Sequence, residues 1–321
     1  MNKISVIGCG RWGTFLGWYA ANHCTFEDVI LYDLKDSPAF IEMQKNRKNS
    51  YLTLSDNMSL TAEISEVLKS NIIIVSIGCQ HLRSLAKQLN EYNLNGKTFL
   101  LAIKGLEEGS AKTIEQIFSE EIKQDIKVAI LAGPGHVQDY LKGVPSCAVI
   151  DSYHPETTDM LIKLLQSDLI RFYYGTDMIG NQIGAAMKNV IGLAAGILDG
   201  LDWYGLKGAL MARAPIEVGR FIQHFGGDPK SVYGLSHLGD YEATLFSKHS
   251  QNRMFGELFA KGEKFEKLAE GVYTLKAVKE ISDRENIDMP ISQALYKVIY
   301  EDAKVKETIK SMFLRDLKQE F

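Results

Sequence analysis

The amino-acid sequence predicts an α/β protein in two parts, a doubly wound α/β domain over residues 1–175 and an all-α domain over residues 176–321. Three observations lead to this division. In the first part, short apolar runs alternate with helical patterns, which is typical of a parallel sheet covered by helices on both faces. Beyond about residue 175, apolar residues recur with helical spacing and β-branched runs become rare. The length of 321 residues also exceeds that of one typical domain.

The expected strands are the short apolar runs, and the expected helices lie between and after them. Strands are expected at 4–7, 29–32, 71–77, 98–103, 126–132 and 146–150. Helices are expected at 14–22, 80–91 and 110–123, and then at about 177–201, 206–225, 239–248, 267–286 and 291–319. In a doubly wound sheet, ligands bind at the carboxyl ends of the strands. Residues that directly follow the strands are therefore the first candidates for a functional site.

The first strand runs directly into a glycine-rich turn. Residues 4–13 read I-S-V-I-G-C-G-R-W-G, in which Gly8, Gly10 and Gly13 form the pattern G-x-G-x-x-G. In this pattern the first glycine allows a tight turn, the second lets a pyrophosphate approach the backbone, and the third lets the next helix pack closely. The N-terminus of that helix also offers unpaired N–H groups to the phosphates. The pattern predicts a Rossmann-type dinucleotide-binding domain.

An acidic residue at the end of the second expected strand bears on the choice of cofactor. Asp33 follows the apolar run V-I-L-Y and lies 20 residues after Gly13. A carboxylate at that position accepts hydrogen bonds from ribose hydroxyls and repels a 2′-phosphate. The sequence therefore predicts NAD rather than NADP.

Composition argues against several classes of protein. The chain is 45% hydrophobic and 24% charged with a formal net charge of −4, so no nucleic-acid partner is expected. The four cysteines are widely spaced and the seven histidines lack metal-binding spacing, so neither a disulfide framework nor a metal site is expected. The longest apolar stretch, 183–201, contains Lys188 and Asp199, which argues against membrane insertion. These features favour a cytoplasmic protein.

Two lysines occupy positions that suit catalysis. Lys104 ends an expected strand in A-I-K-G-L-E, although a surface loop lysine would fit the same pattern. Lys188 lies in a helix whose residues 183–198 are nearly all small or apolar. Burying its charge there costs on the order of several kcal/mol unless the lysine is paired or its pKa is lowered. A lowered pKa suits a general acid, whereas the alternative is an ammonium that reaches solvent.

Further polar residues could complete a site. Asp240 and Thr244 are four residues apart and share a helix face, so Asp240 could tune a nearby lysine. Asn252 and Arg253 could meet a polar or phosphorylated substrate, and each could equally be a cap or a surface residue. His136 lies at a strand end in Gly-Pro-Gly-His, where it could line a cleft or face solvent.

In these motifs, and in their order, the chain resembles the bacterial type of the NAD(P)-dependent glycerol-3-phosphate dehydrogenase family. The resemblance covers nearly the whole length. Its main blocks are Gly8-x-Gly10-x-Trp12-Gly13, Lys104-Gly105-Leu106-Glu107, Gly133-Pro134-Gly135-His136, Lys188-Asn189-Val190, Gly239-Asp240 with Thr244, Ser250-x-Asn252-Arg253, and Glu270-Gly271.

The resemblance implies a homodimer that reversibly reduces dihydroxyacetone phosphate to sn-glycerol 3-phosphate with NADH or NADPH. It implies that Lys188 is the general acid, that Lys104 orients the substrate, and that Asp240 belongs to the same catalytic group. The substrate-binding residues that it implies are Asn189, Thr244, Asn252, Gln251 and His136. The cofactor-binding residues that the pattern and the resemblance together predict are Gly8, Gly10, Arg11, Trp12, Gly13, Asp33, Arg253 and Glu270.

One departure from the family pattern bears on the substrate. The family usually has Ser-Arg-Asn-Arg where this chain has Ser250-Gln251-Asn252-Arg253, and the missing arginine grips the substrate phosphate in relatives. A glutamine brings neither the charge nor the bidentate fork of an arginine. Arg253 or Lys207 could take over this task, or the substrate could be another ketose phosphate, polyol phosphate or hydroxyacid. A non-catalytic NAD(H) sensor is a third possibility, although a sensor has no need of costly buried lysines.

Overall fold

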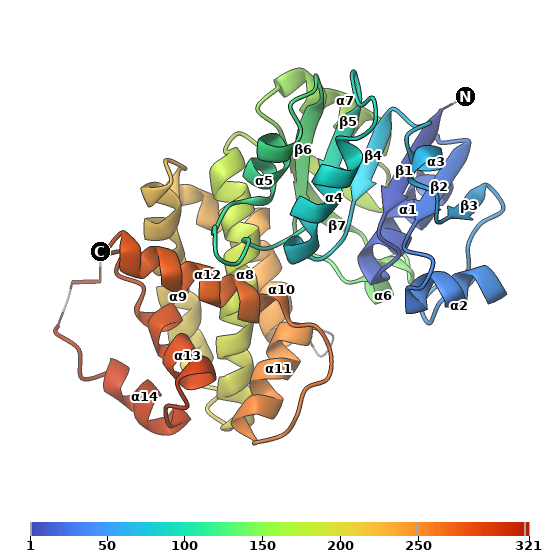
Figure 1. Cartoon of the computed structure of the whole chain (residues 1–321). Coiled ribbons are helices and arrows are strands. Elements are labelled where there is room, and N and C mark those ends of the chain that lie inside the picture. The colour runs from blue at the N-terminus through green and yellow to red at the C-terminus, as the bar shows by residue number, and fades with distance from the viewer. Residues whose placement is uncertain (1, 248–249, 318, 321) are drawn as a thin grey trace.

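The structure is a computed structural model that describes residues 2–247, 250–317 and 319–320, and it contains a sheet domain followed by a helical domain (Figure 1). The sheet has eight strands in the order β3-β2-β1-β4-β5-β6-β7-β8. The strands are β1 Lys3–Ile7, β2 Asp28–Tyr32, β3 Met58–Thr61, β4 Ile72–Val75, β5 Thr98–Leu101, β6 Lys127–Ala132, β7 Ser146–Asp151 and β8 Ile170–Tyr174. All six expected strands are present, and β3 and β8 are additional strands at the two edges.

The sheet is parallel except between β6 and β7, which pair antiparallel. The expectation of a fully parallel sheet was therefore wrong at this pair. The connection 133–145 contains only the single helical turn α6 Val137–Tyr140. A parallel crossover needs a helix that carries the chain back along the sheet, and one turn is too short for that. The strand β7 therefore begins at the same end of the sheet at which β6 ends, and it runs antiparallel to β6.

Helices cover both faces of the sheet and bury an apolar core on each. They are α1 Arg11–His23, α2 Pro38–Asn46, α3 Ile64–Val67, α4 Leu82–Leu89 with the preceding turn η1 Cys79–His81, α5 Ile114–Glu121, and α7 Pro155–Leu165. One core contains Phe15 and Tyr19 of α1, and the other contains Phe99 of β5 and Phe118 of α5. The first helix begins at residue 11 rather than 14, because Gly10 already stands in the extended N-cap position.

The second domain is helical, as expected. Its elements are α8 Met178–Gly200, α9 Leu206–His224, η2 Pro229–Tyr233, the π-helical turn η3 Leu235–Gly239, α10 Asp240–Phe246, α11 Gln251–Ala260, α12 Glu270–Arg284, α13 Pro290–Tyr300 and α14 Val305–Met312. The single helix expected at 291–319 is wrong, because the chain breaks at 301–304, where Asp302 has a positive φ of 53°. The expectation also omitted α11. Residues 248 and 318, which end or interrupt two expected helices, lie outside the described residues.

The chain passes between the domains through residues 175–177, and the exact boundary at residue 175 stays a prediction. The central element beyond it is α8, whose apolar residues form one core with the other helices. Among the described residues, α8 is the one helix whose length and composition would allow it to cross a membrane. Because 89% of its most apolar window is buried inside the protein, it has the burial of a core helix.

Glycines bring α8 and α11 into direct backbone contact. A Cβ atom at Gly196 would lie 1.9 Å from the carbonyl oxygen of Arg253 in α11. In the other direction, a Cβ atom at Gly256 would lie 2.1 Å from the carbonyl oxygen of Leu193 in α8. No side chain larger than hydrogen fits at either position without separating the helices. This glycine seam fixes α11 against the helix that carries Lys188.

Candidate active site

The glycine turn between β1 and α1 has the shape that the sequence predicts. Gly8 has a φ of +102°, and a Cβ atom there would lie 2.2 Å from the carbonyl oxygen of Ser76. A Cβ atom at Gly13 would lie 2.0 Å from the carbonyl oxygen of Gly8, so α1 packs directly on the turn. A Cβ atom at Gly10 would meet nothing within 4 Å. The N-terminus of α1, at Arg11, has no side-chain cap, so its N–H groups are available to an anion.

Asp33 lies against this turn, as expected. Its Oδ2 accepts a hydrogen bond of 2.9 Å from the backbone N–H of Cys9, and its Oδ1 accepts one of 2.8 Å from that of Leu34. Each carboxylate oxygen can accept a further hydrogen bond. The hydroxyl of Thr14, which the sequence reasoning missed, donates to the carbonyl oxygen of Cys9 and braces the turn. A hydroxyl residue directly after the last glycine was the signal for it.

Lys104, Lys188 and Asp240 meet at one carboxylate between the two domains. Lys188 lies in the middle of α8 and donates to Oδ1 of Asp240 and to the hydroxyl of Thr244, each at 3.1 Å. Lys104 follows β5, pairs with Oδ2 of the same carboxylate, and donates to the carbonyl oxygen of Gly133 at 3.1 Å. The side chains are 12% exposed for Lys188, 25% for Lys104 and 6% for Asp240. Two ammonium groups therefore share one buried counterion.

Burial and mutual charge shift the pKa values of this cluster. Burial is the largest cause of a lowered pKa at Lys188, Asp240 opposes it, and the charge of Lys104 adds to the lowering, so that the pKa is about 8. For Asp240 burial acts to raise the pKa, but the two lysines outweigh it and hold this pKa below its usual range. The Lys188 ammonium can thus release a proton near neutral pH, while Asp240 stays ionised.

Around the cluster the structure brings together most of the other expected residues. Asn189 is buried, and its Oδ1 accepts a hydrogen bond of 3.0 Å from Nδ2 of Asn252 in α11. The Oδ1 of Asn252 in turn accepts from the backbone N–H of Gly271 at the start of α12, at 2.9 Å. Gln251 is the first residue of α11, and its buried Oε1 has no hydrogen-bond partner among the described residues. This is the position at which the family resemblance led us to expect an arginine.

His136 and Glu270 reach the same region from other elements. The Nε2 atom of His136 lies 3.4 Å from the carbonyl oxygen of Ala243 in α10, and burial lowers the pKa of this imidazole. Glu270 begins α12, and burial raises its pKa to about 7. A Cβ atom at Gly78, in the turn after β4, would lie 3.0 Å from Oε1 of Glu270. Both side chains thus lie where elements of the two domains meet.

Arg253 and Lys207 lie in a separate ion-pair cluster around Asp199. Arg253 contacts Oδ2 of Asp199 at 2.5 Å and Oε2 of Glu257 at 3.0 Å, and its Nε donates to the carbonyl oxygen of Ser247. Lys207 contacts Oδ1 of Asp199 at 2.5 Å. Both cations considered as replacements for the missing arginine are therefore already paired with a buried carboxylate. The carboxylate of Asp199 thus pairs with Arg253 and Lys207, whereas Lys188, on the same helix, pairs with Asp240.

Comparison with known proteins agrees with this geometry. Residues 3–158 match the family model described as NAD-dependent glycerol-3-phosphate dehydrogenase N-terminus, and residues 177–310 match the model for its C-terminus. The chain belongs to the NAD-dependent glycerol-3-phosphate dehydrogenase family. Curated relatives of that family include the glycerol-3-phosphate dehydrogenase [NAD(P)+] of Staphylococcus aureus strains JH9 and USA300. Each is 31% identical over 336 aligned positions, which cover 100% of both chains.

Solved structures show the fold of the NAD-dependent glycerol-3-phosphate dehydrogenases in this chain. A glycerol-3-phosphate dehydrogenase from Coxiella burnetii superposes with a TM-score of 0.91 at 24% identity, covering 98% of this chain and 99% of the other. One from Saccharomyces cerevisiae superposes with a TM-score of 0.81 at 21% identity, covering 96% and 98%. A ketopantoate reductase from Ralstonia eutropha is more distant, with a TM-score of 0.64 at 13% identity over 97% of this chain and 99% of the other.

Proposed function

We propose that this enzyme transfers a hydride reversibly between NADH and dihydroxyacetone phosphate, and that the product of reduction is sn-glycerol 3-phosphate. The observation that carries the proposal is the pair of lysines, Lys104 and Lys188, on the single carboxylate of Asp240. Membership of the family gives the substrate and the cofactor. A non-catalytic sensor would have no use for two ammonium groups held together in a buried site.

The residues of the glycine turn fit a dinucleotide. The open space at Gly10 and the uncapped N-terminus of α1 suit a pyrophosphate, and the carboxylate of Asp33 suits ribose hydroxyls. We assign Arg11, Trp12 and Glu270 to the same cofactor site, since the first two begin α1 directly after the turn and Glu270 lies against Gly78, just after β4. When bound, the cofactor supplies or accepts the hydride.

In the proposed mechanism, Lys188 is the general acid of the reduction. Its Nζ gives a proton to the carbonyl oxygen as the carbonyl carbon accepts the hydride, and Lys188 is left as a neutral amine. In the oxidation the amine takes the proton back from the hydroxyl. With a pKa of about 8, the group can perform both steps near neutral pH. Lys104 adds a second positive charge where negative charge develops on the oxygen, and Asp240 holds both lysines in place.

The remaining side chains are assigned to the substrate. Thr244 accepts a hydrogen bond from Lys188 and donates one to the carbonyl oxygen of Asp240, so it fixes the direction of the acid. Asn189 and Asn252 bring amide groups from α8 and α11, and Gln251 and His136 complete the set. The cofactor role expected for Arg253 remains a proposal, and its two carboxylate partners restrain its position.

The first experiment follows NADH oxidation by the purified enzyme with dihydroxyacetone phosphate, beside other ketose phosphates and 2-keto acids. A high kcat/KM with dihydroxyacetone phosphate supports the proposal. Negligible turnover there together with turnover of another ketone would mean that the same hydride chemistry acts on another substrate. The glutamine in place of the family arginine is the observation that keeps this second candidate in view. Tight NADH binding without turnover of any ketone would favour a sensor.

Replacing Asp33 by alanine is expected to weaken NADH binding by about tenfold and to narrow its advantage over NADPH. The substitution removes acceptors for the ribose hydroxyls and the charge that repels a 2′-phosphate. The measurement is the Kd of each cofactor by fluorescence titration. The control is Asp36→Ala, which removes an exposed acid a few residues further on. A wild-type preference for NADPH would show that Asp33 does not select the cofactor.

Replacing Gln251 by arginine is expected to lower KM for dihydroxyacetone phosphate by about tenfold, with kcat changed less. The arginine brings a charge and a bidentate fork to the N-terminal turn of α11, where the family has it. Gln251→Lys is the matched variant, because it brings the charge without the fork. An unchanged or raised KM in both variants would mean that this enzyme binds its substrate phosphate with other groups, or that its substrate has none.

We also propose a cytoplasmic homodimer, which the family resemblance and the composition of the chain support. Light scattering coupled to size-exclusion chromatography measures the molar mass of the assembly. A homodimer should have twice the 35.9 kDa of one chain.

A further inference from the structure

Lys104 stands on a loop rather than on a helix or a strand. We call residues 102–113, between β5 and α5, the lysine loop. Its own backbone closes on itself, since the N–H of Glu107 bonds to the carbonyl oxygen of Lys112 and the N–H of Ala111 bonds to that of Glu107. These two bonds shape the far end of the loop. The loop's bond to the sheet is at its first residue, where the N–H of Ala102 donates to the carbonyl oxygen of Val75 in β4, so the position of Lys104 beyond it depends on contacts from neighbouring elements.

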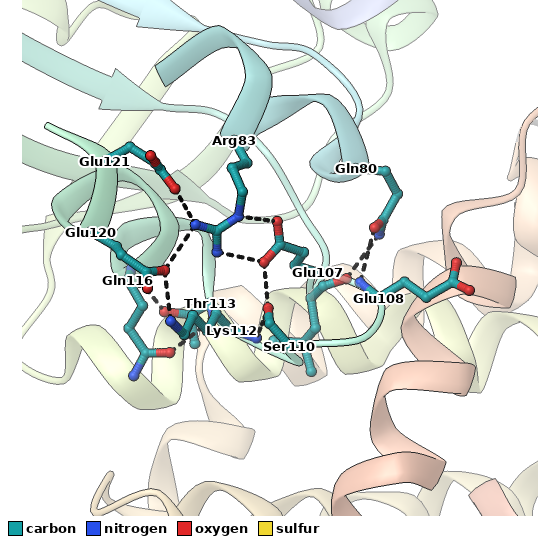
Figure 2. Close-up of polar contacts among 11 residues, drawn as sticks. Gln80, Arg83, Glu107, Glu108, Ser110, Lys112, Thr113, Gln116, Glu120 and Glu121 are labelled. Atoms are coloured by element: carbon teal, nitrogen blue, oxygen red, sulfur yellow. Dashed lines mark hydrogen bonds and ion pairs between the residues drawn. The ribbon is translucent and has the colours of Figure 1, made fainter. Parts of the chain in front are cut away.

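The side-chain amide of Gln80 attaches the loop through hydrogen bonds to its backbone. Its Nε2 donates to the carbonyl oxygen of Leu106 at 2.9 Å, and its Oε1 accepts from the N–H of Glu108 at 2.9 Å (Figure 2). One side-chain amide thus satisfies alternate backbone groups of the loop. The residue lies in η1, the turn that leads from β4 into α4.

Arg83 adds the strongest attachment. Its Nε and Nη2 donate to the two carboxylate oxygens of Glu107, each at 2.7 Å, which is a bidentate pair. Its Nη1 contacts Glu120 at 2.9 Å and also pairs with Glu121, both in α5 (Figure 2). The Glu107 side chain is 13% exposed, and Arg83 holds the pKa of this carboxyl below its usual range. The guanidinium therefore ties the loop to α4 and α5 at once.

The loop is also tied to the helical domain. Glu108 forms an ion pair with Lys276 of α12, the helix that begins at Glu270. At Gly105, a Cβ atom would lie only 2.8 Å from the Cβ atom of Cys79, so the residue after Lys104 packs tightly on η1. Contacts of this kind on both sides leave the loop little freedom to shift the ammonium of Lys104.

We propose that Arg83 and Glu107 are positioning residues, which act through the lysine loop to hold the ammonium of Lys104 on Asp240 and beside Lys188. The inference rests on the proposed function, because it concerns a residue assigned to that reaction. Neither residue belongs to the cluster around Asp240, since their carboxylate and guanidinium partners all lie in α4, α5 and the loop.

Displacement of Lys104 has a signature in the pH profile. The charged and titratable groups that bear on Lys188 are Asp240, Lys104, Arg11, His136 and His237. Of these, Lys104 is the one carried by the loop, and its charge lowers the pKa of Lys188. If the loop releases Lys104, the pKa of Lys188 rises. The alkaline limb of the reduction, where the acid loses its proton, then moves to higher pH.

The test is Glu107→Gln, which keeps the shape of the side chain and removes the charge-assisted pair. The expected result is a loss in kcat of about tenfold, an alkaline limb raised by about half a pH unit or more, and a Kd for NADH within about twofold of the wild type. Arg83→Gln should give the same changes, and the double variant should lose no more than either single one. A variant with wild-type kcat, or with lower kcat and an unmoved limb, would overturn the proposal.

The matched control is Glu121→Gln, which removes one partner of Arg83 in α5 and leaves its bidentate pair with Glu107 intact, whereas Glu120 also pairs with Lys112 of the loop. Its kcat should stay within about twofold of the wild type. Amide hydrogen exchange reports on the loop even if the wild type shows no turnover, which separates failure of the proposed function from failure of this inference. Exchange of the Glu107 and Ala111 amides should be faster in Glu107→Gln and unchanged in Glu121→Gln. Equal exchange in both variants would count against the positioning role.

Discussion

Replacing Lys188 by alanine is expected to lower kcat for the reduction by about three orders of magnitude, while the Kd for NADH stays within about twofold. The variant lacks the proposed proton donor, and Lys104 cannot replace it without leaving its bonds to Asp240 and Gly133. The glycine turn and Asp33, which are assigned to the cofactor, are untouched. Steady-state rates and fluorescence titration of NADH measure the two quantities separately.

Two further variants show whether the loss comes from the proton or from the packing of α8. Lys188→Met keeps most of the volume and should lose as much activity as the alanine variant. Lys97→Met also removes a partly buried lysine, one that donates to the carbonyl oxygens of Leu68 and Ser70, and should keep wild-type kcat. A kcat within about tenfold of the wild type in Lys188→Met would remove Lys188 from the role of general acid.

Replacing Asp240 by asparagine is expected to lower kcat by about 100-fold and to move the alkaline limb of the reduction to lower pH. The wild-type limb should lie near pH 8, because Lys188 must carry its proton and its pKa is about 8. Asp240 opposes the lowering of that pKa, so its loss leaves two ammonium groups facing each other and lowers the pKa further. The direction is opposite to that expected for Glu107→Gln. The measurement is kcat against pH for both variants.

The same substitution is expected to cost about 3 kcal/mol in the free energy of unfolding, because it leaves buried charges without their counterion. Denaturant unfolding measures this cost. Glu217→Gln is the matched control, since Glu217 is another buried acid of the helical domain, where it accepts hydrogen bonds from the N–H groups of Ile291 and Ser292. It should lose stability without moving the alkaline limb. If Asp240→Asn behaves in the same way, Asp240 has a structural role only.

The parts of the fold that the sequence predicts are those with a strong local pattern. The strands β1, β4 and β5 are short runs of apolar residues buried on both faces, and they stand out from the helices around them. The edge strands β3 and β8 are partly exposed and alternate in polarity, so their runs are broken and were missed. The direction of β7 depends on how the connection after β6 packs, which no local pattern records.

The candidate site also has one part that the sequence predicts and another part that it does not. The glycine turn and Asp33 lie within one β-α-β unit, so their spacing in the sequence is enough to bring them together. Lys104 and Asp240 are separated by 136 positions, and their contact follows from how the two domains meet. The residues suggested that Asp240 could tune a nearby lysine, and the resemblance alone implied that Lys104 and Asp240 belong to one catalytic group. Glu107 belongs to a block of the family resemblance, but its pairing with Arg83 gave no signal, because the pair forms across a turn and a loop whose shapes the sequence does not specify.

The glycine seam between α8 and α11 has a consequence for divergence within the family. With Gly196 and Gly256 pressed on opposing backbone, α11 can neither slide nor tilt relative to the helix that carries Lys188. A lineage that changes its substrate is therefore expected to exchange side chains on α11 rather than to move the helix. Gln251 is the first residue of α11 and is half-buried, so a new residue there is expected to alter recognition while the distance from α11 to Lys188 stays the same. Because the glycine seam fixes α11, specificity can change through its side chains while the arrangement around Lys188 stays the same.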